Sequence, residues 1–135
     1  MVVDIQRLLV RVVTDVIGSD AHAAFHALGR PHDWRVELRS THDSQRQADL
    51  RATYEWCQVS VPDLGVGVTL FAYDDDEDTK EAPLRELAMV VRAHLRGEGS
   101  VEYKRGPLGR RPVLTVEAND RVWRLGRRVS SGFAP

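Results

Sequence analysis

Cysteine and lysine are scarce in this chain, and each scarcity limits what the protein can be. Cys57 is the only cysteine among 135 residues, so no disulfide can form within the chain. This agrees with a protein of the reducing cytoplasm. Only Lys80 and Lys104 are lysine among the 19 basic residues, and the others are arginine. This preference is typical of a GC-rich bacterial genome, so arginine clusters carry less functional weight here than elsewhere.

The chain also lacks a long apolar run and a large excess of charge of either sign. Charged residues interrupt the apolar N-terminal stretch every few positions, at Asp4, Arg7, Arg11 and Asp15. A membrane helix needs about 20 consecutive apolar residues, and a signal peptide needs an unbroken apolar core. We therefore expect a cytoplasmic protein with no membrane contact. A formal net charge of −1 disfavours a surface built wholly for nucleic acid.

The residues that are present suffice for one folded unit. A 42% share of hydrophobic residues can supply a core, and 135 residues fit one domain. We expect a single α+β domain over residues 1–128. Residues 129–135 are small and polar, and we predict a flexible tail there.

Three segments carry the spacing of helices. In residues 3–17 the apolar positions recur at intervals of three and four, and their broad arc implies burial or contact with a partner. Ser19 resembles the N-cap of a short second helix over residues 20–28, which Gly29 ends. The strongest apolar stripe predicts a third helix over residues 84–96.

The remaining segments indicate strands joined by short turns. Residues 34–39 alternate apolar and charged side chains, and residues 40–49 form a long polar connection that could contain a helical turn. Further strands are predicted at 53–61, 66–73, 100–105, 112–118 and 121–127. The predicted order is α-α-β-β-β-α-β-β-β, an α+β fold whose mainly antiparallel sheet of about five to six strands has helices packed on one face.

The last two predicted strands also define a register. If Asn119 and Asp120 form a two-residue turn, Val116 lies opposite Trp123 and Leu114 lies opposite Leu125. This register places all four of those apolar side chains on one face of the sheet, toward the core.

His22 and His26 suggest a metal site, but only weakly. On the predicted short helix they would share a face, as zinc-binding histidines do. No glutamate lies between them to act as a general base, and no Cys or His pair downstream completes a known spacing. Surface histidines explain the same pattern, so we predict no metal and no cofactor.

Two segments of opposite charge are candidates for partner binding. The acidic block comprises Asp74, Asp75, Asp76, Glu77 and Asp78, and its negative charge complements the N-terminal end of the following helix. The basic C-terminal segment contains Lys104, Arg105, Arg110, Arg111, Arg121, Arg124, Arg127 and Arg128, with Tyr103 and Trp123 interleaved. Such a pattern can bind single-stranded nucleic acid, but the predicted register buries Trp123 and removes the stacking surface.

Tyr54 and Trp56 are a further candidate, because they share one face of a predicted strand. If helices cover the opposite face, both aromatic side chains point outward, as at many binding hot spots. The alternative is that both faces of this strand are covered.

The sequence contains no nucleophile elbow, phosphate-binding loop or other catalytic constellation. We therefore expect a non-enzymatic protein–protein interaction module, such as an immunity or antitoxin-type protein, an adaptor or a subunit. A small-molecule-binding protein or modest enzyme is the alternative, with a pocket between sheet and helices near His22, His26 or His94. Nucleic-acid binding through the basic C-terminal hairpin is third. Homodimerisation is compatible with all three.

Overall fold

The computed structural model of the protein describes residues 3–30, 32–107 and 109–127. Its helices are α1 (Ile5–Val12) and α2 (Glu77–Leu95). Its strands are β1 (Ala21–Ala27), β2 (Trp34–Ser40), β3 (Gln47–Ala52), β4 (Trp56–Val61), β5 (Val66–Phe71), β6 (Ser100–Gly106), β7 (Gly109–Ala118) and β8 (Arg121–Arg127).

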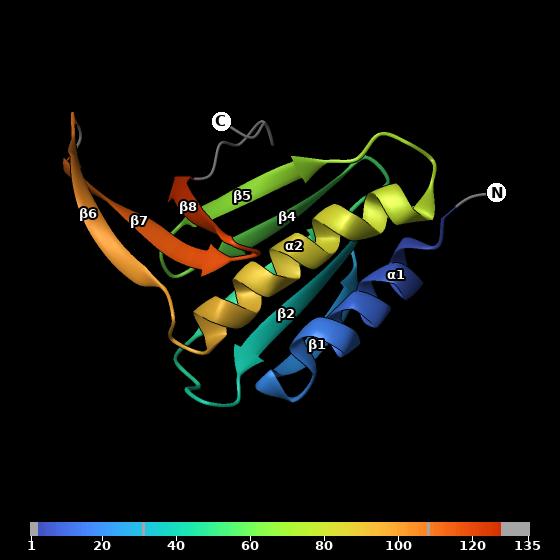
Figure 1. The fold of residues 1–135 in the computed structure, drawn as a ribbon, viewed down its shortest axis with the longest axis horizontal. Helices are drawn as coiled ribbons and strands as arrows, with labels where there is room; N and C mark the ends of the chain where they lie inside the picture. The colour runs from blue at the N-terminus through green and yellow to red at the C-terminus, as the bar shows by residue number, and fades with distance from the viewer. Residues whose placement is uncertain (1–2, 31, 108, 128–135) are drawn as a thin grey trace.

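The strands form one eight-stranded antiparallel sheet in the order β1-β2-β3-β4-β5-β8-β7-β6. Both helices pack on the same face of this sheet (Figure 1). The predicted α+β class, with an antiparallel sheet and helices on one face, is confirmed. The predicted number and order of elements were wrong, because five strands, rather than three, lie between the helices. Neither described helix has the length and apolar character that a membrane crossing requires.

The first helix forms where the sequence predicts it. Asp4 caps α1, since its carboxylate accepts a hydrogen bond of 3.1 Å from the Arg7 backbone N–H. The chain continues as a π-helical turn over Val13–Ile17 and leaves the helix at Gly18, whose φ is +51°. The broad apolar arc is explained by burial, since Val3, Ile5, Leu8, Leu9, Val12, Val13 and Ile17 are all buried.

The predicted short helix over residues 20–28 was wrong, because this segment is β1. All seven residues of β1 pair with β2, from Ala21 opposite Ser40 to Ala27 opposite Trp34. Alanine-rich segments favour helix locally, but that preference is weak compared with the hydrogen bonds of a sheet edge. His22 and His26 therefore lie on a strand.

The polar connection over residues 40–49 also differs from the prediction, because β3 begins within it at Gln47. From there Ala48, Leu50 and Ala52 are buried in alternation with polar neighbours. This is the period of a half-buried strand, and the sequence shows it, although two of the buried residues are only alanines. Residues 41–46 form the turn between β2 and β3.

The second helix starts seven residues earlier than predicted, at Glu77 instead of Leu84. Its N-cap is Asp76, whose side chain accepts a hydrogen bond from the Asp78 backbone N–H. Pro83 lies inside the helix, where it removes one backbone donor. The predicted apolar stripe is confirmed, since Leu84, Leu87, Ala88, Val91 and Leu95 are buried.

The predicted C-terminal register is confirmed in full. Val116 pairs with Trp123 and Leu114 pairs with Leu125, and all four side chains are buried. The turn residues Asn119 and Asp120 have φ angles of 57° and 59°. Positive φ at both central positions defines a type I′ turn, which suits the twist of a hairpin.

This turn predicts that Asp120→Gly stabilises the protein, because glycine adopts a positive φ without the steric penalty that aspartate has. We expect the free energy of unfolding to rise by about 0.5–1 kcal/mol in urea denaturation. Asp120→Val is the matched control and should lower it, because a β-branched side chain resists a positive φ. Equal stability of the two variants would contradict the assigned turn.

Candidate functional site

The β6–β7 hairpin projects from the body of the molecule at one end of its long axis (Figure 1). Its partner strand β8 pairs with β5 at only two positions, Val66 with Arg127 and Gly67 with Gly126. The β6–β7 pairing, in contrast, extends over all seven residues from Ser100 to Gly106. The hairpin is therefore well paired internally but diverges from the rest of the sheet.

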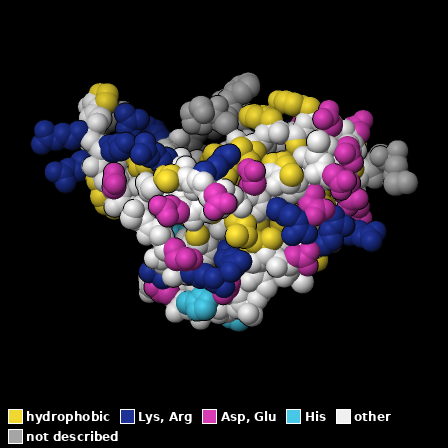
Figure 2. All heavy atoms as spheres, in the orientation of Figure 1, with side chains coloured by type: hydrophobic (Ala, Val, Ile, Leu, Met, Phe, Trp, Pro, Cys, Tyr) yellow, Lys and Arg dark blue, Asp and Glu magenta, His cyan; other side chains and the backbone are white. Residues whose placement is uncertain are grey.

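The projecting hairpin places like charges directly opposite each other. Lys104 pairs with Arg111, and Arg105 pairs with Arg110, in consecutive positions of the ladder. All four side chains are exposed, and Figure 2 shows Lys and Arg side chains gathered on this end of the molecule. Like charges directly opposite across an antiparallel pair are destabilising. We call this cluster the basic hairpin.

Among the described residues, most arginines outside the C-terminal strands are neutralised, and the exceptions are Arg7, Arg30 and Arg39. Seven arginines outside these strands form ion pairs with carboxylates: Arg11, Arg35, Arg46, Arg51, Arg85, Arg92 and Arg96. Within the described part of the chain, no ion pair neutralises a cation of β6, β7 or β8, namely Lys104, Arg105, Arg110, Arg111, Arg121, Arg124 and Arg127. Arg128, the remaining member of the predicted basic patch, lies outside the described residues.

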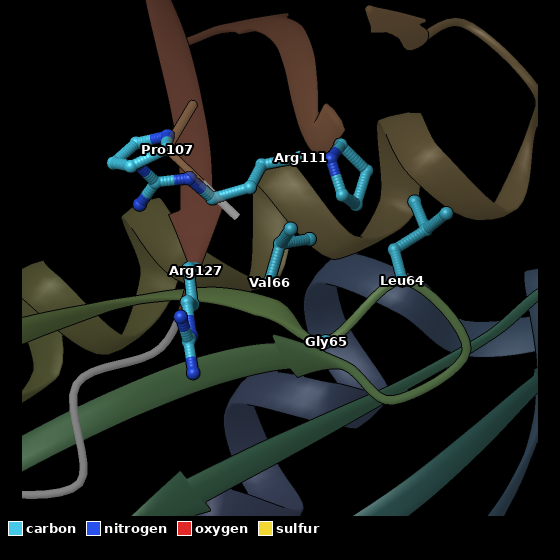
Figure 3. Close-up of a pocket in the computed structure, with 7 residues that line it drawn as sticks. Leu64, Gly65, Val66, Pro107, Arg111 and Arg127 are labelled. Carbon is cyan, nitrogen blue, oxygen red and sulfur yellow. The ribbon is translucent and has the colours of Figure 1, made fainter. Parts of the chain in front are cut away.

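A cleft of about 510 Å³ lies between the hairpin and the β4–β5 turn. Figure 3 shows Leu64 and Val66 on the turn side and Arg111 on the hairpin side. Gly65, Pro107, Pro112 and Arg127 complete the described lining. The described lining therefore combines apolar residues with Arg111 and Arg127, and none of it is acidic.

Arg111 is held close to the hairpin turn. A Cβ added to Gly106 would lie 2.7 Å from Nη2 of Arg111, so the guanidinium covers this glycine. Gly106 pairs with Gly109 across the turn. The missing side chain at residue 106 thus makes room for a cation at the mouth of the cleft.

The acidic block lies at the opposite end of the long axis from the basic hairpin (Figure 2). Part of its charge is used within the fold. Asp76 caps α2, and Glu77 and Asp78 lie in its first turn, where they complement the helix dipole. Glu77 also forms an ion pair of 3.2 Å with Arg11 on α1. Asp74 and Asp75 are exposed in the loop before the helix.

Tyr54 and Trp56 are only half-buried, and both are engaged by cations of the protein itself. Tyr54 lies in the turn before β4 rather than on the strand, and Nζ of Lys80 lies 4.4 Å from its ring centroid. The Arg51 guanidinium lies 5.0 Å from the Trp56 ring. Trp56 is on the face of the sheet turned away from the helices, whereas Cys57 is buried beneath them.

Lys80 closes this end of the core. It is 5% exposed and donates hydrogen bonds to the backbone carbonyls of Tyr54 and, at 2.9 Å, of Ala72. These contacts tie the start of α2 to the loops on either side of the β4–β5 hairpin. The Tyr54 region is thus stabilised from within the fold.

The histidines do not converge. His22 and His26 are exposed on β1, and His26 lies 3.5 Å from Glu37 on β2. Burial lowers the pKa of His94, which lies in the last turn of α2. In the part of the chain that the structure describes, no three His, Cys, Asp or Glu side chains are grouped as a metal would require.

The space between sheet and helices is closely filled. A cavity there, lined among others by Ile5, Cys57, Lys80 and Leu84, measures about 10 Å³, which is at most one water. Burial, with a smaller effect of Glu86, raises the pKa of the Cys57 thiol to about 12. A thiol in that state is a poor nucleophile.

A second charged cluster, which the sequence analysis did not predict, joins three distant segments. The buried Asp20 carboxylate lies 2.8 Å from Nε2 of His42 and accepts a hydrogen bond of 3.1 Å from Arg96. Thr41 donates a hydrogen bond of 2.8 Å to the carbonyl of Ser19. These contacts fix the β2–β3 turn to the end of α2, and no local sequence pattern could have indicated them.

Comparison with protein-family models, curated proteins and solved structures finds no match to this chain. Guanidinium groups bind carboxylates and phosphates through paired hydrogen bonds, and the apolar lining of the cleft adds contact area for a hydrophobic group. The arrangement suits recognition of an anionic, partly apolar ligand.

The Asp20 cluster predicts an acid-dependent contribution to stability. The His42 hydrogen bond and, more weakly, Arg96 hold the pKa of Asp20 below its ordinary value of 3.8 despite its burial. The ionised carboxylate therefore stabilises the folded state above about pH 4, and this contribution is lost as the pH falls through the lowered pKa.

We expect Asp20→Asn to lower the free energy of unfolding at neutral pH. The difference from the wild type should shrink below pH 4, as measured by urea denaturation across pH. Asp75→Asn, in an exposed loop, is the control and should change little. A difference that persists unchanged at low pH would show that packing, not charge, explains the effect.

Proposed function

We propose that this protein is a non-enzymatic binding module that docks an acidic segment of another protein on the basic hairpin and the cleft beside it. The observation that carries the proposal is the hairpin itself, which presents two consecutive like-charge pairs, Lys104 with Arg111 and Arg105 with Arg110. The cations of the C-terminal strands form no ion pair within the described structure, so they are available to bind another protein.

The arrangement works against the stability of the isolated protein. Each like-charge cross-strand pair disfavours the hairpin by roughly 0.2–1 kcal/mol. A preference for arginine in the genome explains the frequency of arginine but not its placement opposite another cation. An anionic partner would turn this repulsion into attraction, and features that reduce stability in this way often serve function.

The cleft favours an acidic protein segment over nucleic acid. Its lining includes Leu64, Val66 and Pro112, which suit an apolar side chain next to a carboxylate. Trp123, the aromatic residue that could stack on a base, is 4% exposed and lies under Arg121, whose guanidinium is 3.7 Å from the ring. Tyr103 remains exposed, but a single tyrosine is a small stacking surface.

A small anionic molecule is a second candidate, favoured by the size of the cleft. Its volume of about 510 Å³ lies within the range of ligand pockets. Such a ligand would contact Arg111 and Arg127 but not Arg105 or Arg110, which do not line the cleft. Substitutions of Arg105 and Arg110 should therefore weaken binding of an acidic protein segment but not of a small ligand.

The proposal predicts opposite effects on stability and on binding for the double variant Lys104→Glu with Arg110→Glu. Each glutamate would lie opposite an arginine, so the repulsive pairs become attractive ones. We expect the midpoint of thermal unfolding to rise, because each new pair contributes about 0.2–1 kcal/mol. Binding of the acidic partner should be lost.

The measurement is capture of partners by the immobilised protein from nuclease-treated host lysate, followed by mass spectrometry and by titration of the purified candidate. Arg7→Glu with Arg30→Glu is the control, since it makes the same change in charge at exposed positions far from the hairpin. A partner retained by the Lys104 and Arg110 variant would contradict the proposal. Capture that depends on intact nucleic acid would support the nucleic-acid alternative instead.

A further inference from the structure

In the described part of the chain, the outer side of β1 is an open sheet edge. Among the described residues β1 pairs with β2 alone, and five of its seven residues are exposed. Open edges expose unpaired backbone N–H and C=O groups, and proteins usually protect them with charged residues, proline or bulges. β1 pairs with β2 without interruption and contains neither proline nor an Asp, Glu, Lys or Arg side chain.

The other edge of the same sheet is protected. β6 carries Glu102, Lys104 and Arg105, all exposed, within its seven residues. A second strand approaching β6 would have to accommodate these charges. The contrast between the two edges favours β1 as the edge that pairs with a further strand.

The sequence of β1 is nearly symmetric about its central residue, Ala24. It reads Ala-His-Ala-Ala-Phe-His-Ala over Ala21–Ala27. Two copies that pair antiparallel about a two-fold axis at Ala24 would place alanine against alanine at the ends and His22 against His26 on the face turned away from the helices. On the helix face, Ala23 would lie opposite the larger Phe25, so that each small residue accommodates a large one.

A two-fold symmetric dimer allows only certain registers between the two β1 strands. A two-fold axis perpendicular to the sheet keeps each side chain on its own face. At such an axis, one residue of the strand lies directly opposite the same residue of the second copy. The axis at Ala24 alone uses all seven residues of β1. We infer that β1 is a homodimer interface, at which two copies pair edge to edge into one continuous sheet centred on Ala24.

This interface is independent of the basic hairpin, because β1 and β6 are the two opposite edges of the sheet. A dimer would therefore present two basic hairpins at its far ends. Failure of either proposal leaves the other intact.

Disulfide trapping tests the register directly. Paired residues in an antiparallel ladder have Cα atoms about 4.5–5.5 Å apart, which matches the spacing of a disulfide. Ala24→Cys should therefore form a covalent dimer under mild oxidation, since the two new cysteines would meet at the axis. The native Cys57 is buried and does not compete.

His22→Cys is the matched control, at an equally exposed position on the same strand. In the proposed register the two cysteines at residue 22 would be about 14 Å apart, too far for a disulfide. Trapping of the Ala24→Cys protein at least tenfold faster than of the His22→Cys protein is the expected result. Equal rates would overturn the inference.

A second variant tests the dimer without cysteine. Ala24→Lys places lysine opposite Glu37 within one copy, which favours the folded monomer, but opposite a second lysine at the axis. Sedimentation equilibrium should show concentration-dependent dimers for the wild type and for Val101→Lys, a control on the β6 edge, but monomers for Ala24→Lys. A wild-type protein that stays monomeric at every accessible concentration, or an Ala24→Lys protein that still dimerises, would refute the interface.

Discussion

The packing of α2 is the contact on which the rest of the structure depends. The helix contacts β3 and β4 on one side and β7 on the other, and it also touches α1 and the π-helical turn after it. Strand pairing alone joins the last three strands to the first five at only two positions. The buried stripe that includes Leu84, Leu87 and Val91 therefore holds the two parts of the sheet together. Because this contact is apolar and continuous, it holds the C-terminal strands in place although β8 pairs with β5 at only two positions.

The candidate site lies where the C-terminal strands join the rest of the sheet. Val66 and Arg127, one of the two residue pairs that connect β5 to β8, both line the cleft. The basic hairpin projects from this junction (Figure 1). The acidic block lies at the other end of the long axis, so its charges cannot neutralise the hairpin within one molecule. The repulsion between the paired cations of the hairpin therefore depends on the strand pairing as well as on the sequence.

Parts of this architecture could be predicted because the relevant information was local. The register of Leu114 and Val116 against Trp123 and Leu125 follows from strand alternation and a two-residue turn, and both are short-range features. The stripe of α2 likewise repeats within one segment. β1 was mistaken for a helix because Ser19, Gly29 and the alanines between them suit a helix, whereas the partner that makes them a strand lies in β2. β3 was missed because two of its three buried residues are alanines, whose small side chains give a weak periodic pattern.

For the candidate site, the sequence by itself determined the composition: an acidic block, a basic C-terminal segment, a single cysteine and a strong amphipathic helix. Only the tertiary structure decided which cations lie opposite each other, which arginines are paired with carboxylates, and that Leu64 and Val66 lie beside Arg111. It also decided that the histidines remain apart and that Asp20 meets His42 and Arg96. The physical reason is that periodicity and turn chemistry act over a few residues. Ion pairs, clefts and sheet edges instead arise between segments that only the folded chain brings together.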